Sequence, residues 1–333
     1  MTTPAGSPQH DWHDVRLHVV TGKGGTGKTT VAAALALALA SGGKRTLLTE
    51  VEGRQGIAQL FDSPPLPYEE RKVAVAPRGG DVFALAIDPE EALLEYLEMF
   101  YNMRRAGRVL KRLGAIDFAT TIAPGLRDVL LTGKVKESVT RGRRGGPQYD
   151  AVVLDAPPTG RSARFLNVNA EVAGLARMGP VKNQADSVMD LLRSPRTAVH
   201  VVTILEEMPV QETIDGVREL EEADLPVGAV IVNMTRTPLL SAADLARAAA
   251  GDVDREELSR GLKAAGIEAG PSVVGGLTAE AVEHARRVQL EERERDELAE
   301  LERPTYELPL LADSVDLGGL YHLAESLIEQ GAA

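Results

Sequence analysis

The chain has 333 residues, of which 44% are apolar and only 4% aromatic, a composition typical of a globular α/β protein. Its 37 basic and 49 acidic residues give a formal charge of −12, which opposes nucleic acid and anionic lipid surfaces as partners. The sequence contains no cysteine. This excludes disulfides, thiolate zinc sites, iron–sulfur clusters and trivalent-arsenic thiol sites from the chain.

The start of the chain carries no targeting signal that we can identify. Residues 1–14 lack a basic segment followed by an apolar run, so we expect a flexible leader rather than a signal peptide or an anchor. The longest uninterrupted apolar run, residues 31–40, is far shorter than the ~20 residues that a membrane-spanning helix needs. We therefore expect a cytoplasmic protein with no direct membrane insertion.

A glycine-rich turn follows the first strand-like run, residues 15–20, and precedes a helical run at 31–40. It matches the pattern G-x-x-x-x-G-K-[ST], whose backbone N–H groups cradle the phosphates of a nucleotide. The alternative is a glycine-rich turn without a ligand. The candidate nucleotide-binding residues are Gly22, Gly24, Gly25, Thr26, Gly27, Lys28, Thr29 and Thr30, with Thr29 also a candidate Mg²⁺ ligand. The pattern does not explain the second lysine of the turn, Lys23.

Further strand-like runs alternate with helical segments, which predicts crossover connections and a doubly wound, mostly parallel sheet. These runs cover residues 45–51, 81–87, 149–155, 198–204, 227–233 and 305–311. We expect one P-loop NTPase domain over residues 15–331. Two segments are too long for single crossovers, and we expect them to form an inserted helical subdomain, from about 90–147 and 162–195. Residues 236–303 are polar and mostly helical in pattern, with alternating charges typical of a solvated helix.

Asp155 ends the strand-like run at 149–155 and is followed by "APPTG". A carboxylate at this position is a candidate Mg²⁺ ligand, usually through water, facing the hydroxyl of Thr29. Gly160 can bring a backbone N–H to the γ-phosphate, and such a segment would respond to the presence of that phosphate. The alternative is an ordinary strand-end aspartate before a proline turn.

With these two motifs the sequence resembles the deviant-phosphate-loop ATPases, in the branch that holds the arsenite-pump ATPase and the tail-anchored-protein targeting ATPase. In that family the extra lysine, here Lys23, reaches the nucleotide of the partner across a dimer interface. The resemblance implies ATP and Mg²⁺ as cofactors, and a homodimer or a heterodimer with a paralogue. It also implies catalytic roles for Lys23 and Lys28. The alternative for Lys23 is an ordinary phosphate contact within one subunit.

The resemblance extends to "DAPPTGRSARFL", "APGLRDVL", "PVQETIDGVREL", "VIVN" and "ELPLL". It implies that Asn233 hydrogen-bonds the edge of adenine. The same comparison implies that Pro309, Leu310 and Leu311 pack on the adenine ring. The alternative for Asn233 is a turn residue at the end of a strand.

Three departures from the family pattern affect these expectations. Glu52 stands where the family has the aspartate that activates the attacking water, and Glu50 competes for the role because it points to the same face. The longer side chain leads us to expect slow hydrolysis, since a misplacement of ~1 Å can cost about a hundredfold in rate. The zinc-binding cysteines of the targeting ATPase are missing, so a dimer would be held without metal. Arg161 replaces a histidine, with no evident consequence.

Apolar residues occur at more than one face of the segment 93–103, so the helical subdomain is a candidate site for an apolar client helix or a membrane protein. The commoner explanation is the core of the subdomain. We therefore predict an ATP-hydrolysing dimeric switch that couples the γ-phosphate to this subdomain. Two alternatives are a hydrolysis-poor regulatory subunit that pairs with a paralogue, and a positioning ATPase. The acidic charge argues against the last.

Overall fold

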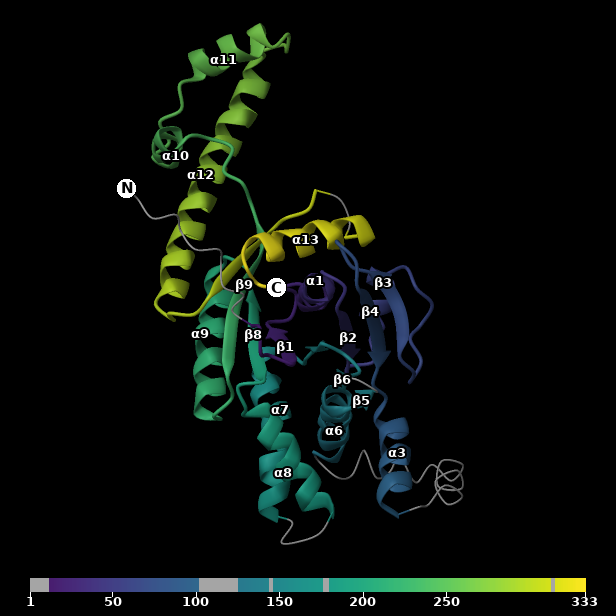
Figure 1. Ribbon diagram of the computed structural model, residues 1–333. Helices are drawn as coiled ribbons and strands as arrows, with labels where there is room; N and C mark the ends of the chain where they lie inside the picture. The colour runs from purple at the N-terminus through teal and green to yellow at the C-terminus, as the bar shows by residue number, and fades with distance from the viewer. Residues whose placement is uncertain (1–11, 102–124, 144–145, 176–179, 313–314) are drawn as a thin grey trace, which may run out of the picture.

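The computed structural model describes residues 12–101, 125–143, 146–175, 180–312 and 315–333, and within them the chain forms an eight-stranded sheet flanked by helices (Figure 1). The strand order is β10-β9-β8-β1-β7-β2-β4-β3, and every neighbouring pair is parallel except β3 with β4. This confirms the predicted α/β fold with a mostly parallel sheet. The strands are β1 (Leu17–Gly22), β2 (Arg45–Glu50), β3 (Arg71–Val75), β4 (Asp81–Ala86), β7 (Ala151–Asp155), β8 (Thr197–Thr203), β9 (Val227–Thr235) and β10 (Thr305–Pro309).

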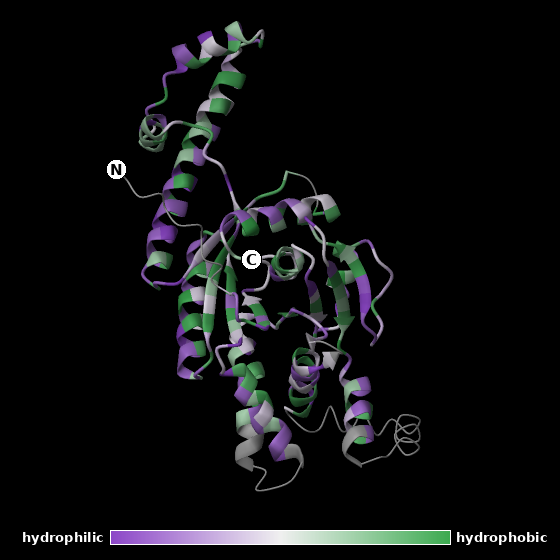
Figure 2. Cartoon of the chain, in the orientation of Figure 1, coloured by the Kyte–Doolittle hydropathy of each residue, from purple (hydrophilic) through white to green (hydrophobic). Residues whose placement is uncertain are grey.

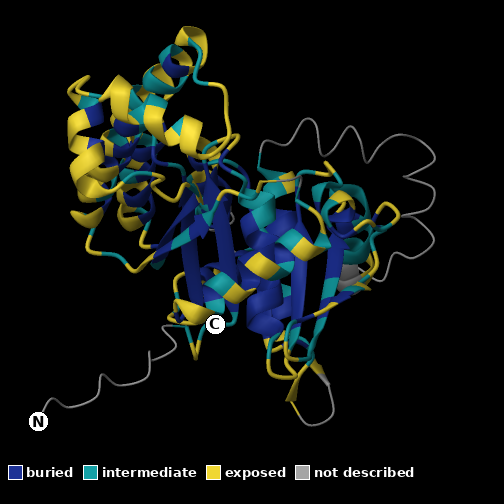
Figure 3. Cartoon of the chain, turned by 90° about the horizontal axis from the view of Figure 1, so that it is seen from above, coloured by how far each residue is buried: buried dark blue, intermediate teal, exposed yellow. Residues whose placement is uncertain are grey.

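The core lies on both faces of this sheet. One face is covered by α1 (Lys28–Ala40) and α13 (Leu317–Glu329), and the other by α6 (Leu126–Thr140), α7 (Thr159–Leu175), α8 (Pro180–Leu192) and α9 (Glu207–Glu222). Residues 31–40 of α1 are all buried, because α1 lies between the sheet and α13. Its sequence is accordingly apolar on every side. Figure 3 shows the strands and α1 as the buried centre of the molecule.

The helices α3 (Pro89–Tyr101), α6, α7 and α8 come from the two segments for which we expect a helical subdomain, and they pack on one another below the sheet in Figure 1. Ala92 and Leu93 of α3 are buried against Leu130 of α6, so the start of the apolar segment 93–103 is packed between these two helices. The side chains of Met99, Phe100 and Tyr101, and residue 103, lie outside the described part of the chain.

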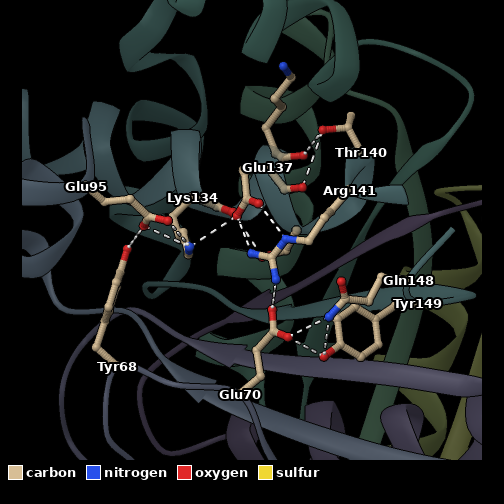
Figure 4. A network of polar contacts seen from close by, with 11 residues as sticks. Tyr68, Glu70, Glu95, Lys134, Glu137, Thr140, Arg141, Gln148 and Tyr149 are labelled. Atoms are coloured by element: carbon tan, nitrogen blue, oxygen red, sulfur yellow. Dashed lines mark hydrogen bonds and ion pairs between the residues drawn. The ribbon is translucent and has the colours of Figure 1, made fainter. Parts of the chain in front are cut away.

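A polar network joins α3 and α6 to the neighbouring sheet edge (Figure 4). The ammonium of Lys134 lies 2.8 Å from Glu95 and 3.1 Å from Glu137, and Glu137 also pairs with Arg141. Arg141 in turn reaches Glu70, which precedes β3, at 2.8 Å. The network thus ties the start of the helical subdomain to the two-stranded hairpin of β5 (Gly142–Arg143) and β6 (Gly146–Pro147) and to the segment before β3.

Residues 236–303 form a helical arm that rises away from the sheet (Figure 1) and carries a mixed polar and apolar surface (Figure 2). Its helices are α10 (Ala242–Ala249), α11 (Arg255–Ala264) and α12 (Pro271–Ala299). Leu245 of α10 packs on Ala285 and Val288 of α12, whereas α11 buries no residue. The arm therefore has its own small core where α10 packs on the middle of α12, and a solvated helix α11.

Two features were not expected from the sequence. The edge strand β3 has one buried residue, Ala74, among exposed and half-buried positions and begins with two charged residues, so it gives no continuous apolar signal. Trp12, assigned above to a leader, donates a hydrogen bond from Nε1 to Tyr306 Oη at 3.1 Å and packs edge-on against His200. Trp12 is thus packed against the fold. Within the described residues, no helix combines the length and apolar character that a membrane crossing requires.

Candidate nucleotide site

The glycine-rich turn joins the carboxyl end of β1 to the N-terminus of α1, the position in which a phosphate loop adds a helix dipole to its N–H groups. At two positions of this turn, a residue with a side chain would clash with neighbouring atoms. A Cβ at Gly22, whose φ is 151°, would lie 2.2 Å from the carbonyl oxygen of Val202. A Cβ at Gly27, with φ 81°, would lie 2.4 Å from Nδ2 of Asn233. Gly25 also has a positive φ of 92°, which favours glycine there.

The two lysines of the loop point to different partners. Lys28 Nζ folds back and donates to the carbonyl oxygen of Lys23 at 3.1 Å, and Thr26 Oγ1 donates to the same oxygen at 2.9 Å. Burial lowers the pKa of Lys28 from its ordinary value, and the nearby carboxylates of Asp155 and Glu52 oppose this shift. The ammonium of Lys23 instead lies 2.5 Å from Oε1 of Glu212 on α9. Only Lys28 is therefore directed into the loop.

Asp155 lies beside the loop because β7 is the neighbour of β1, with Val20 and Asp155 in register. Thr29 Oγ1 donates to Asp155 Oδ2 at 2.7 Å. Burial raises the pKa of Asp155 to about 6, against the lowering effect of the Thr29 hydrogen bond and the charge of Lys28. A hydroxyl and a carboxylate in contact supply the hard oxygen ligands that Mg²⁺ prefers, so Thr29 and Asp155 fit a magnesium site.

Glu50 and Glu52 have different surroundings. Glu50 is buried. Its two carboxylate oxygens accept hydrogen bonds from the backbone N–H groups of Gln55 at 2.6 Å and Ile57 at 3.2 Å. These contacts fix the start of the short helix α2 (Gly56–Leu60). Glu52 keeps a side chain that is 22% exposed, with arginine nitrogens at 3.5 Å (Arg54) and 3.9 Å (Arg161). Glu52 is therefore the carboxylate that remains available at the loop, and Arg161 lies beside it.

The end of β9 borders the same loop, and the end of β10 lies beside it in the sheet. Asn233 of β9 is buried, and its Nδ2 donates to the carbonyl oxygen of Thr26 at 2.9 Å, which leaves the amide oxygen of the side chain for another donor. The backbone N–H of Leu310 donates to Thr235 at 2.8 Å, so Pro309, Leu310 and Leu311 leave the sheet next to the end of β9. Leu310 is exposed and Leu311 is half-buried.

The segment 156–160 is attached to the loop strand and leads directly into the helical subdomain. Thr21 Oγ1 on β1 donates to the carbonyl oxygen of Pro157 at 2.7 Å. Gly160, at the start of α7, is exposed and has no atom within 4 Å of a Cβ position. Its backbone is therefore open to an approaching group. Glu212 was missed from the sequence, and the segment "PVQETIDGVREL" gave no signal that this side chain reaches the loop.

The parallel sheet, the strand–loop–helix turn at the carboxyl end of β1 and the Thr29–Asp155 contact define an α/β nucleotide-binding protein of the P-loop class. Comparison with known proteins narrows this class. Residues 15–194 match the model of the anion-transporting ATPase family. The chain belongs to this family of ATPases, which confirms the resemblance drawn from the sequence.

Individual relatives support the same assignment. The chain is 55% identical to ATPase BagA of Mycobacterium tuberculosis over 335 aligned positions, which cover 99% of this chain and 98% of that protein. It is 28% identical to ATPase GET3 of Kluyveromyces lactis, over 64% of this chain and 70% of the relative. It is 27% identical to the arsenical pump-driving ATPase of Acidiphilium multivorum, over 64% of this chain and 38% of the relative.

Proposed function

We propose that the chain is a Mg²⁺-dependent ATPase that works as a dimer and couples the γ-phosphate of ATP to the shape of its helical subdomain. The observation that carries this proposal is the meeting of three groups from two segments of the chain. Lys28 and Thr29 of the loop lie with Asp155, and Thr29 contacts Asp155 at 2.7 Å. Phosphoryl transfer from ATP requires a cation that faces the phosphates, and a hydroxyl and a carboxylate that hold Mg²⁺.

Within this proposal each residue has a defined task. The loop N–H groups and Lys28 bind and orient the phosphates, and Thr29 and Asp155 hold Mg²⁺, which neutralises developing charge when bound. Glu52 accepts a proton from the attacking water. Its availability supports this assignment over Glu50, which is used by two backbone N–H groups. Asn233 contacts the loop at Thr26, and residues 309–311 lie beside the end of β9, which supports a role for both in holding adenine.

The link to the helical subdomain runs through residues 156–160. Gly160 opens α7, and α7 packs on α8 and α6. A γ-phosphate that binds the Gly160 N–H would pull the start of α7 toward the loop, and hydrolysis would release it. An apolar client helix or a membrane protein is the partner we propose for the subdomain, at a cytoplasmic location, in keeping with relatives named as anion-transporting or pump-driving ATPases.

The direction of Lys23 supports a role in trans. Its ammonium turns out of the loop toward α9, whereas Lys28 occupies the loop itself. A cation that is not directed at its own nucleotide is free to serve the nucleotide of a second subunit, a homodimer partner or a paralogue. No nucleic acid is required by this assembly.

A second candidate function is favoured by one observation. The carboxylate of Glu52 lies within 4 Å of both Arg54 and Arg161, so two ion pairs compete with the attacking water for its oxygens. A chain of this kind would bind ATP and regulate a paralogue with little turnover of its own.

The substitution Asp155→Asn tests the leading proposal. We expect Mg²⁺-dependent phosphate release to fall by at least about a hundredfold, because the site loses an anionic oxygen ligand. Thermal stability should be kept or raised, since burial already raises the pKa of this carboxyl group. The matched control Asp296→Asn removes an exposed carboxylate from the arm and should leave phosphate release unchanged. Sedimentation with ATP and Mg²⁺ measures the dimer in parallel.

Three results separate the candidates. Phosphate release by the parent chain alone, lost in Asp155→Asn, supports the ATPase. ATP binding with no release supports the regulatory subunit. The absence of any Mg²⁺-dependent ATP binding overturns both.

A further inference from the structure

The contact between Lys23 and Glu212 joins the phosphate loop to α9 across 189 residues of sequence. Lys23 Nζ lies 2.5 Å from Glu212 Oε1, and the side chains are 33% and 38% exposed. Both groups are thus at the surface, where a second molecule can reach them, and yet the ammonium is already held by a fixed acceptor. A charge-assisted hydrogen bond of this length fixes the end of the lysine side chain.

The carboxylate of Glu212 stands on a rigid support. The helix α9 buries one face through Pro209, Val210, Thr213, Gly216, Val217 and Leu220. One turn beyond Glu212, a Cβ at Gly216 would lie 3.2 Å from Cγ2 of Thr159, so the helix approaches the start of α7 as closely as a glycine permits. The same helix therefore contacts the loop through Glu212 and the segment before α7 near Gly216.

We propose that Glu212 is the positioning residue of Lys23. It holds the ammonium away from Lys28 and presents it at the surface, in the place from which the partner's nucleotide is reached. This proposal rests on the role in trans that we give to Lys23. It assigns a task to α9 that neither the loop motif nor the family match contains.

The chemistry of the pair suits this task. A lysine side chain has four rotatable bonds, and a free one would be distributed over many rotamers. Its ammonium has three N–H donors, so one can remain on Glu212 while the other two face phosphate oxygens. The carboxylate also compensates for the second positive charge in a short loop, where two ammonium groups would otherwise repel each other. Glu212 would thus act through the orientation of Lys23 and would not touch the nucleotide.

The test compares Glu212→Gln with Glu219→Gln, which removes a charge from an exposed position of the same helix. Each substitution is made in the parent chain and in Lys23→Ala, and phosphate release is measured against ATP and against protein concentration. We expect Glu212→Gln to lower kcat about tenfold, with the KM for ATP changed less than about twofold, because orientation and not nucleotide binding is lost. Glu219→Gln should change neither.

The kcat of the double variants in the Lys23→Ala background distinguishes a positioning role of Glu212 from a purely structural one. If Glu212 acts only through Lys23, Glu212→Gln has no further effect once Lys23 is removed. Glu212→Asp keeps the charge but is one methylene shorter, so its kcat should fall between the parent and Glu212→Gln. This variant also serves as the test if Glu212→Gln does not fold.

Several outcomes overturn the inference. An unchanged or raised kcat in Glu212→Gln does so, the latter because it would make the contact inhibitory. An equal loss in the Lys23→Ala background does so too, because it would show an effect on folding. In these cases Lys23→Ala alone still lowers kcat, and the proposed function stands. If Lys23→Ala has no effect, the proposed role in trans fails first and the inference fails with it.

Discussion

At the scale of single residues, Glu50 and Glu52 show how two carboxylates two positions apart acquire different tasks. Glu50 is buried and accepts two backbone N–H groups at the start of α2, whereas Glu52 is partly exposed beside Lys28 and Arg161. A carboxylate that already satisfies two buried donors is costly to remove from the fold. A carboxylate that faces the loop, as Glu52 does, can interact with the attacking water instead.

This difference predicts that substitution of Glu52 lowers activity and that substitution of Glu50 lowers stability. Glu52→Gln should lower the rate of phosphate release by about a hundredfold and leave thermal stability unchanged, because a general base is lost from a surface position. Glu50→Gln should lower the free energy of unfolding by about 1–3 kcal/mol, since one amide cannot accept two N–H groups with the strength of a carboxylate. Urea denaturation and single-turnover hydrolysis of both variants measure the two effects. If the Glu50→Gln variant were folded but inactive and the Glu52→Gln variant were active, Glu50 would be the general base and Glu52 would not.

Residues of the loop could be predicted from the sequence because their pattern is local. The spacing of Gly22, Gly27, Lys28 and Thr29 is contained in eight residues, and Asp155 follows from the end of an apolar strand. The choice between Glu50 and Glu52 could not be made, since their spacing puts both on one face of a strand. It depends on where the chain turns at Gln55 and Ile57. Glu212 could not be found at all, because its partner is 189 residues away.

At the scale of elements, burial decides which could be predicted. The buried strands have continuous apolar runs and were predicted, whereas β3 is an edge strand with exposed positions and was not. The helix α1 is apolar on every side because it is covered by both the sheet and α13. The contacts of α9 with the loop and with α7 required the tertiary structure, since its sequence reads as an ordinary amphipathic helix.

The close approach of α9 to α7 predicts an unequal pair of glycine substitutions. Gly261→Ala on α11 should stabilise the chain by about 0.5–1 kcal/mol, because its Cβ meets no atom within 4 Å and alanine favours helix. Gly216→Ala should show no such gain and should lower stability relative to Gly261→Ala by about 1 kcal/mol or more, since its Cβ would meet Thr159 at 3.2 Å. Thermal melts of the two variants measure this difference. Equal gains would show that α9 can move away from α7 at no cost.

At the scale of the whole molecule, the centre of the sheet contains two buried polar side chains that the nucleotide site does not use. The rings of His18 on β1 and His200 on β8 are nearly parallel, with centroids 5.4 Å apart, and they meet edge to edge, with His18 Nδ1 3.1 Å from His200 Nε2. The backbone N–H of Ala229 donates to His200 Nδ1 at 3.1 Å, so His200 carries its proton on Nε2 and donates it to His18. Both rings are therefore neutral members of one hydrogen-bonded chain across three strands.

This pair makes global stability depend on pH in a defined direction. Burial lowers the pKa of His200 to about 4, and burial together with the charge of His200 holds the pKa of His18 well below 6.5. The unfolded chain thus takes up protons below about pH 6.5 that the folded chain excludes, and stability is lost as the pH falls through this range. Each histidine contributes a slope of up to about 1.4 kcal/mol per pH unit. The raised pKa values of Asp128, Asp155 and Glu294 act in the opposite direction, so the contribution of the two histidines is measured as the difference between a variant without them and the parent chain.

The double substitution His18→Gln, His200→Gln should therefore reduce this slope between about pH 5 and about pH 6.5, because glutamine can accept the Ala229 N–H and does not titrate there. Its stability near neutral pH should be lower than that of the parent, since the buried, hydrogen-bonded rings are lost. Urea denaturation at several pH values measures the slope, and His322→Gln, at an exposed position of α13, is the matched control. A slope in the double variant as steep as in the control would mean that the acid sensitivity of the fold originates elsewhere, and that the buried pair takes up protons without unfolding.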